Sequence, residues 1–406
     1  MLSPKDNIHS TSSSWILLLA LLTAIAPLST DMYLPALPVM AQHYDVSTLV
    51  VANSLPAYFL GLALGQLIYG PLSDRIGRKK PLLFGLSLHI IASILCVYVE
   101  DIQSLLWLRI LQALGSCVGL VLARAAIRDI LSTDQAAKAF ASMMIVMGIA
   151  PVIAPTLGAW LLLILPWQAI FWALACLGLV ALLWVIFKFE ETLPIDRRLK
   201  LSFLQVGQLY LNIFKDRSFV SPMLAGCFSF GVLFCYINVA AAVLMDIFHL
   251  NQQQFAYVFG TNAIGTIILS AMNHRLEGKF NVVQRLHLGG YVQLMGIFLM
   301  AVANLWQEMR FVGTVLGLFL AVAGIGLTAP NSMALAMSKQ GRQAGSASAL
   351  MGSIQFGFGL LSGILLNILL FDMVWNLIIA MFIFVFCSNL FIYYTKKSIS
   401  VSVLSN

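Results

Sequence analysis

Apolar residues gather in twelve runs of about 20 residues along this chain, and short polar turns separate the runs. A helix of that length crosses the roughly 30 Å of hydrocarbon in a bilayer, so each run predicts one membrane-spanning helix. The predicted spans are 15–38, 50–71, 81–99, 105–126, 137–164, 166–187, 218–246, 253–273, 286–304, 310–336, 343–370 and 374–394. The expected fold class is an all-α membrane protein with twelve transmembrane helices.

The longest polar segment, residues 188–217, divides the twelve spans into two sets of six. We therefore expect an N-terminal six-helix bundle at 1–187, a cytoplasmic linker at 188–217 and a C-terminal six-helix bundle at 218–406. Repeated halves joined in this way are typical of secondary transporters, whose site lies near the bilayer midplane between the halves.

Lysine and arginine occur mainly in alternate loops. The basic loops are 72–80, 127–138, 188–217, 274–285 and 337–342, together with the C-terminal tail. The other loops carry acids or no charge, with Arg310 as the exception. By the positive-inside rule the basic loops and both chain ends face the cytoplasm. The first run shows no clear cleavage site, so we expect it to be retained as a helix.

Composition excludes several classes of protein. The chain is 60% hydrophobic and 10% charged, which is too few charges for a soluble protein of 406 residues. The net charge of +7 does not predict nucleic-acid binding, because no basic stripe alternates with aromatic residues. The six cysteines lie in apolar runs without CxxC spacing, which predicts neither disulfides nor a metal site.

Asp31 and Arg109 are ionisable residues inside predicted spans. Both are expected in the outer half of the membrane, where they could pair. Charges in a membrane are costly and usually functional, so Asp31 is interpreted as a carboxylate that exchanges a proton for another partner. The alternatives are a fixed ion pair that joins two helices and a hydrated Asp31 near the membrane surface.

The fourth and fifth spans carry further candidates. Arg109, Gln112 and Ser116 form one helical stripe, and Gln112 is interpreted as facing a cavity. In the fifth span two prolines lie between two glycines, and this pattern bends or loosens a helix. It indicates either a gate seam between the halves or a purely structural kink. The residues concerned are Gly148, Pro151, Pro155 and Gly158.

Polar residues in other spans could line a cavity or join helices by hydrogen bonds. They are Asn53, Tyr58, Tyr236, Asn238, Asn331 and Gln355. No phosphate-binding loop, metal-ligand spacing or GxSxG elbow occurs in the sequence. We therefore expect neither an enzyme nor ATP as energy source, and no cofactor.

The turn at 70–81 concentrates four cations between two apolar runs. Gly70-Pro-Leu-Ser-Asp74-Arg75-Ile-Gly77-Arg78-Lys79 resembles motif A of the major facilitator superfamily. Arg109-x-x-Gln112 resembles motif B, and Pro155-x-x-Gly158 resembles motif C, the antiporter motif. The string Thr-Asp-Met-Tyr-Leu-Pro-Ala-Leu-Pro at 30–38 resembles the first helix of the bicyclomycin/chloramphenicol-resistance (Bcr/CflA) branch of drug:proton antiporters.

This resemblance implies a multidrug efflux transporter of the bacterial inner membrane, driven by the proton gradient. Its partners would be the lipid bilayer, small-molecule drugs and protons, and its working unit a monomer. Asp31 would carry the proton or substrate, with Arg109 as its partner. Asp74 would meet the N-terminal end of the eleventh helix and, with Gly70, Arg75, Gly77 and Arg78, form an inner gate. The alternative for the loop cations is simple topology marking.

Two alternatives for function remain at this point. One is a proton-coupled transporter for a single metabolite. The other is a membrane-embedded enzyme or receptor, against which the absent catalytic motifs and the two six-span halves argue.

Overall fold

The computed structural model describes residues 13–131, 133–198 and 203–404. These residues form helices and no strand, and twelve helical segments among them are long and apolar enough to cross a membrane. The twelve spans and the all-α fold class are therefore confirmed. The predicted cytoplasmic chain ends include residues 1–12 and 405–406, and the predicted linker includes 199–202; these lie outside the described residues.

The first six spans end at Lys188. They comprise α1 (Ser13–Asp31), a 3-10 turn η2 (Leu34–Ala36), α2 (Leu37–His43), α3 (Thr48–Ala52), α4 (Ser54–Ile76), α5 (Lys79–Val97), α6 (Ile102–Ile130), α7 (Thr133–Ile164) and α8 (Gln168–Lys188). The predicted linker holds a 3-10 turn η3 (Ile195–Arg197) and a helix, α9 (Phe203–Lys215). The prediction of two domains and a linker remains a prediction.

The last six spans begin at Arg217. They comprise α10 (Arg217–Ala241) with a π turn η4 (Ala242–Ile247), α11 (Gln252–Arg275), α12 (Val282–Ala303), a 3-10 turn η5 (Gln307–Met309), α13 (Arg310–Ala323), α14 (Ile325–Met337), a 3-10 turn η6 (Gly341–Gln343), α15 (Ala344–Ile368) and α16 (Met373–Leu404).

Prolines explain where the first two spans break. Pro35 has no backbone N–H to donate to the carbonyl of Asp31, and α1 ends at Asp31. In the same way, Pro56 has no N–H for the carbonyl of Ala52, and α3 ends at Ala52. The sequence places the end of the second span at Pro71, but α4 continues past this proline to Ile76. A side chain from α9, described below, replaces the hydrogen bond that Pro71 removes.

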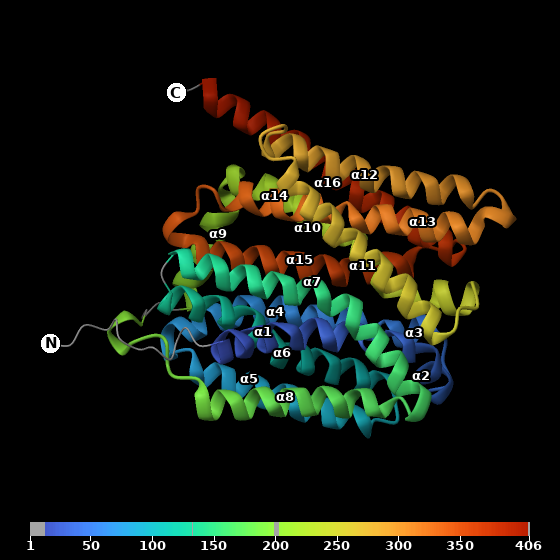
Figure 1. Ribbon diagram of the computed structural model, residues 1–406, viewed down its shortest axis with the longest axis horizontal. Coiled ribbons are helices and arrows are strands. Elements are labelled where there is room, and N and C mark those ends of the chain that lie inside the picture. The colour runs from blue at the N-terminus through green and yellow to red at the C-terminus, as the bar shows by residue number, and fades with distance from the viewer. Residues whose placement is uncertain (1–12, 132, 199–202, 405–406) are drawn as a thin grey trace.

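Two pairs of helices form most of the seam between the halves, α4 with α15 and α7 with α11 (Figure 1). The outer helices expose large apolar side chains, including Phe84, Trp107, Ile164 and Phe298, as a lipid-facing surface requires. We call the end of the bundle with the Ile76–Lys79 turn and α9 the basic end. The other end, with α2 and α3, is the opposite end.

Candidate functional site

Asp31 lies at the break in the first span, as the last residue of α1. Its side chain is buried, with the residue only 4% exposed. No ion pair among the described residues includes it. A buried carboxylate without a cation is costly in its charged form, so this position is suited to exchanging a proton or a cationic group.

The predicted ion pair between Asp31 and Arg109 is not formed in the described part of the chain. Arg109 is fully buried, and it donates to the Ser29 carbonyl at 2.9 Å and to the side chain of Gln112. The ring of Tyr33 lies 4.3 Å from its central carbon. Arg109 therefore occupies the carbonyl end of α1, where the helix dipole favours a cation.

The stripe on α6 forms one connected network. Gln112 donates to the Ser93 hydroxyl at 2.7 Å, and the hydroxyls of Ser116 and Tyr58 lie 2.6 Å apart. The Tyr58 ring covers Arg109 at 4.3 Å from its central carbon. Arg109, Gln112 and Tyr58 thus contact one another. They do not form an ion pair or hydrogen bond with Asp31 among the described residues.

Two polar residues of the second half lie on helices that contact the break after Asp31. Tyr236 is on α10 and Asn262 is on α11, and both helices contact η2. These two residues are 1% and 2% exposed. Neither the Tyr236 hydroxyl nor either polar atom of Asn262 completes a hydrogen bond with a described residue. Buried polar groups are normally paired, so this pair of second-half residues has unused hydrogen-bonding capacity.

The proline-glycine segment of α7 touches both the break and the other half. A Cβ at Gly158 would overlap the Met32 carbonyl oxygen, next to the end of α1. A Cβ at Gly148 would meet its nearest atom 3.6 Å away, on a side chain of α11. Pro151 and Pro155 lie between the two glycines, inside α7.

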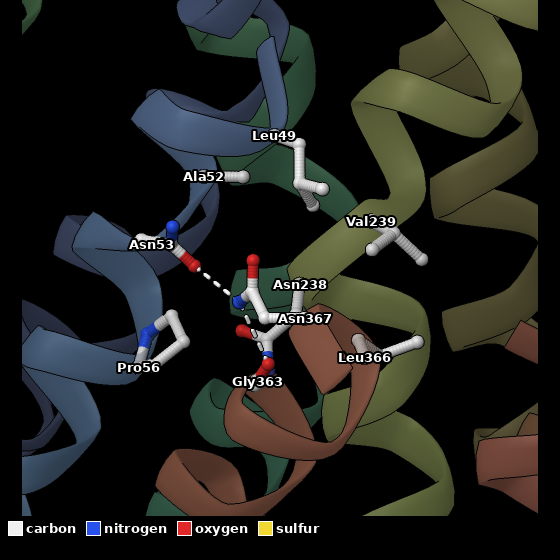
Figure 2. Close-up of a pocket in the computed structure, with 9 residues that line it drawn as sticks. All are labelled: Leu49, Ala52, Asn53, Pro56, Asn238, Val239, Gly363, Leu366 and Asn367. Carbon is white, nitrogen blue, oxygen red and sulfur yellow. Dashed lines mark hydrogen bonds between the residues drawn. The ribbon is translucent and has the colours of Figure 1, made fainter. Parts of the chain in front are cut away.

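At the opposite end an amide pair joins the halves (Figure 2). Asn53, between α3 and α4, accepts a hydrogen bond from the side-chain amide of Asn367 of α15 at 2.7 Å. Asn367 also donates to the Gly363 carbonyl at 2.9 Å. Asn53 was predicted as a cavity residue; in this structure it bridges α4 and α15.

Three other predicted cavity residues take different positions. Asn238 donates to the Ser362 hydroxyl at 2.9 Å, joining α10 to α15 within the second half. Asn331 donates to the Asn273 side chain at 2.8 Å, joining α14 to α11. Both act here as interhelical glue. Gln355 is half-buried on α15.

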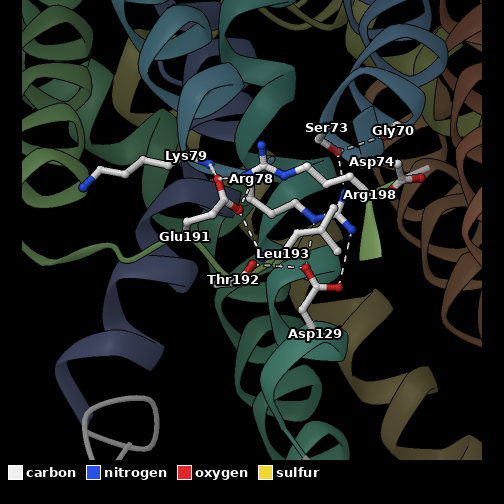
Figure 3. A network of polar contacts seen from close by, with 10 residues as sticks. All are labelled: Gly70, Ser73, Asp74, Arg78, Lys79, Asp129, Glu191, Thr192, Leu193 and Arg198. Carbon is white, nitrogen blue, oxygen red and sulfur yellow. Dashed lines mark hydrogen bonds and ion pairs between the residues drawn. The ribbon is translucent and has the colours of Figure 1, made fainter. Parts of the chain in front are cut away.

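Arg78 is the centre of a polar network at the basic end (Figure 3). Its guanidinium donates to Ser73 and Asp74, both at 2.6 Å, and to Asp129 of α6 at 2.9 Å. Burial alone would lower the pKa of Arg78, but the hydrogen bonds and charges of Asp129 and Asp74 outweigh it and raise that pKa. Arg78 is therefore always charged and fixed between α4 and α6.

Glu191, three residues after α8, closes the same network (Figure 3). Its carboxylate accepts from the backbone N–H of Arg78 at 2.8 Å and of Lys79 at 3.3 Å. These N–H groups begin α5, so Glu191 caps that helix from the linker. Gly77 has φ of +93° and lies against this carboxylate, where a Cβ would overlap it. Only glycine fits this turn.

Comparison with known proteins identifies the family. The model of the Major Facilitator Superfamily matches residues 19–364. The chain belongs to the Major Facilitator Superfamily. It is 33% identical to the uncharacterized MFS-type transporter YdgK of Bacillus subtilis, over 84% of this chain and 85% of that protein.

Two further relatives carry names that refer to resistance. The bicyclomycin resistance protein homolog of Haemophilus influenzae is 30% identical, over 88% of this chain and 89% of that protein. The chloramphenicol resistance protein of Pseudomonas aeruginosa is 30% identical, over 79% and 75%. Among solved structures, a D-xylose-proton symporter superposes with a TM-score of 0.71 at 13% identity, covering 92% of this chain and 96% of that one.

As a superfamily member, the chain has its motif A turn at the basic end of the seam. Gly70 faces Ala349 of α15, where a Cβ would lie 4.0 Å away. Asp74 pairs with Arg78, and the guanidinium beside the first turn of α15 belongs to Arg128. A contact between Asp74 and the eleventh span stays a prediction. Arg75 is exposed.

The linker helix α9 joins the basic ends of both halves. Ile213 packs in a cluster with Phe219 of α10 and Leu350 of α15. On the neighbouring face, the Tyr210 hydroxyl donates to the Leu67 carbonyl of α4 at 3.3 Å. In this superfamily fold α9 therefore contacts both sides of the seam.

The sequence did not point to five residues of these networks. They are Asp129, Glu191, Tyr210, Asn262 and Asn367. Glu191 lies just after the sixth span, at the start of the basic linker 188–217. An acidic residue in a basic segment was the signal that could have identified it. The other four give no local signal, because their partners lie on helices far away in the sequence.

Proposed function

We propose that this protein is a proton-coupled multidrug efflux transporter that exports small, mostly apolar compounds across the bacterial inner membrane by alternating access. The relatives named for bicyclomycin and chloramphenicol resistance support drug efflux, because each matches most of the chain. The energy source is the proton gradient, with no bound cofactor. The working unit is a monomer, and both chain ends and the basic end face the cytoplasm.

The observation that carries proton coupling is Asp31, a buried carboxylate that no ion pair among the described residues includes. It ends α1, just before the turn η2 that α10 and α11 of the other half contact. When the site opens to the outside, a proton neutralises the carboxylate. When it opens to the cytoplasm, cargo displaces that proton. Arg109 stays on the carbonyl end of α1 and holds the break in place, which makes it a positioning residue.

The test uses everted vesicles that contain the protein, energised to acidify their interior and monitored with a pH dye. Addition of drug should release protons in the wild type. Asp31→Asn should abolish this release while the protein still folds. Asp45→Asn is the matched control, because Asp45 is exposed in the turn between α2 and α3. Drug-evoked release that survives Asp31→Asn would refute the role of Asp31.

A transporter for a single metabolite is the second candidate. It differs in one measurable respect, since only one compound in a broad panel would then evoke proton release. An enzyme or receptor would evoke none. The low number of charges within the spans favours loosely specified, apolar cargo.

A further inference from the structure

We infer that Tyr236 and Asn262 form the second-half part of the cargo site and select compounds that carry a hydroxyl or amide group. This inference rests on the proposed efflux function and names the cargo class. The two residues lie on different helices, α10 and α11, and both helices contact η2, the turn that follows Asp31 in the first half. A compound bound among the three therefore contacts both halves at once.

The pairing of buried amides sets Asn262 apart. The fully buried Gln293 donates to the Ala321 carbonyl at 3.2 Å and accepts from the Ser229 hydroxyl at 3.0 Å. Gln112 is paired in the same way. Within the described part of the chain, Asn262 is the buried amide with both polar atoms unpaired. Such a group is destabilising unless something else completes its hydrogen bonds.

The chemistry of the cluster defines what completes it. Asn262 offers one acceptor oxygen and a donor NH2 group, and the Tyr236 hydroxyl can donate and accept. A hydroxyl or an amide does both, so either group satisfies the pair. The ring of Tyr236 stacks on that of Phe259 with centroids 5.3 Å apart, which adds an apolar wall. The best cargo is thus a mostly apolar molecule with neutral polar groups.

A cation without hydrogen-bonding groups would use the cluster differently. It gains from the Asp31 charge but cannot pair with Asn262 or the Tyr236 hydroxyl. Two probe compounds therefore separate the roles of the two halves. Chloramphenicol carries hydroxyl and amide groups, and tetraphenylphosphonium carries a charge and no hydrogen-bonding group.

The experiment measures binding of both probes to the purified full-length protein and its variants. Asn262→Leu and Tyr236→Phe should each weaken chloramphenicol binding roughly tenfold, the cost of an unpaired buried group. Binding of tetraphenylphosphonium should change less than about twofold, since no hydrogen bond is lost. Asn389→Leu is the control: Asn389 has one unpaired amide atom but lies on α16, with its NH2 group bonded within that helix.

Each other result counts against the inference. Equal weakening of both probes would assign Tyr236 and Asn262 a structural role, and unchanged chloramphenicol binding would remove them from the site. A wild-type protein that binds tetraphenylphosphonium but not chloramphenicol would overturn the inference and leave efflux standing. Absence of drug-evoked proton release for every compound would instead defeat the proposed function, and this inference with it.

Discussion

The Tyr210 hydroxyl donates to the Leu67 carbonyl, which lacks a helical partner because the residue four positions later is Pro71. A proline inside a helix leaves this carbonyl without its donor. The linker helix α9 supplies the missing donor while its other side packs on the second half. The carbonyl left free in α4 is thus the point at which the linker helix binds the first half.

Tyr210→Phe should loosen the basic end of the seam. One hydrogen bond contributes about 0.5–1.5 kcal/mol, so opening should increase roughly two- to tenfold. The readout is the labelling rate of a cysteine at Ala349, which faces Gly70 across the seam, in a cysteine-free background. The Pro71→Ala background provides the control, because alanine restores the N–H donor to Leu67. A Tyr210→Phe effect of the same size in that background would show that the bond is irrelevant.

The same contact should be insensitive to pH between about 5 and 9. Burial, with a smaller contribution from the Asp74 charge, raises the pKa of Tyr210 to about 12. The hydroxyl is the donor only while protonated, so the bond is present below the ordinary pKa of tyrosine and is lost as pH rises through the raised value. The thiolate is the reactive form of cysteine, so the labelling rate itself rises with pH. The ratio of the Ala349→Cys labelling rates with Phe and with Tyr at position 210 should therefore stay constant over this range. A change in that ratio centred below pH 9 would implicate another group.

Glu191→Ala should destabilise the protein and Glu190→Ala should not. Glu191 caps the first N–H groups of α5. The adjacent Glu190 is also exposed, but no hydrogen bond among the described residues joins it to α5. Loss of a cap costs about 0.5–2 kcal/mol. Thermal unfolding in detergent is the measurement, with a lower midpoint expected for Glu191→Ala alone. Equal midpoints for the two variants would contradict the capping role.

Gly158→Ala should abolish transport and Gly148→Ala should leave most of it. A methyl group at Gly158 overlaps the Met32 backbone carbonyl, which cannot move without shifting the break beside Asp31. At Gly148 the nearest atom is a side-chain carbon 3.6 Å away. Vesicle transport assays at matched protein levels make the comparison. Full activity of Gly158→Ala would show that the break is free to shift.

Asn53→Ala and Asn367→Ala should each favour opening of the opposite end, and their effects should not add. The two side chains share one hydrogen bond of 2.7 Å between the halves, so the second substitution has little left to remove. Labelling of a cysteine at Leu49, which lies near this pair in Figure 2, reports the opening. Strictly additive effects would mean that the two residues act independently.

The sequence by itself determined the twelve spans and the motifs of the superfamily. The spans follow from apolar run length. Proline removes the donor for the carbonyl four residues earlier, but this alone did not decide where a helix ends, because α1 ends four residues before Pro35 whereas α4 continues through Pro71.

Only the tertiary structure decided which groups satisfy the carbonyls left free at the end of α1 and before Pro71. Arg109 binds the Ser29 carbonyl across 80 residues of chain, and Tyr210 binds the Leu67 carbonyl across 143. The possible ion pair of Asp31 with Arg109 does not form among the described residues, because depth in the membrane does not specify the direction of a side chain. That direction is set by packing between helices, which leaves Asp31 buried at the end of α1 and Arg109 on the Ser29 carbonyl.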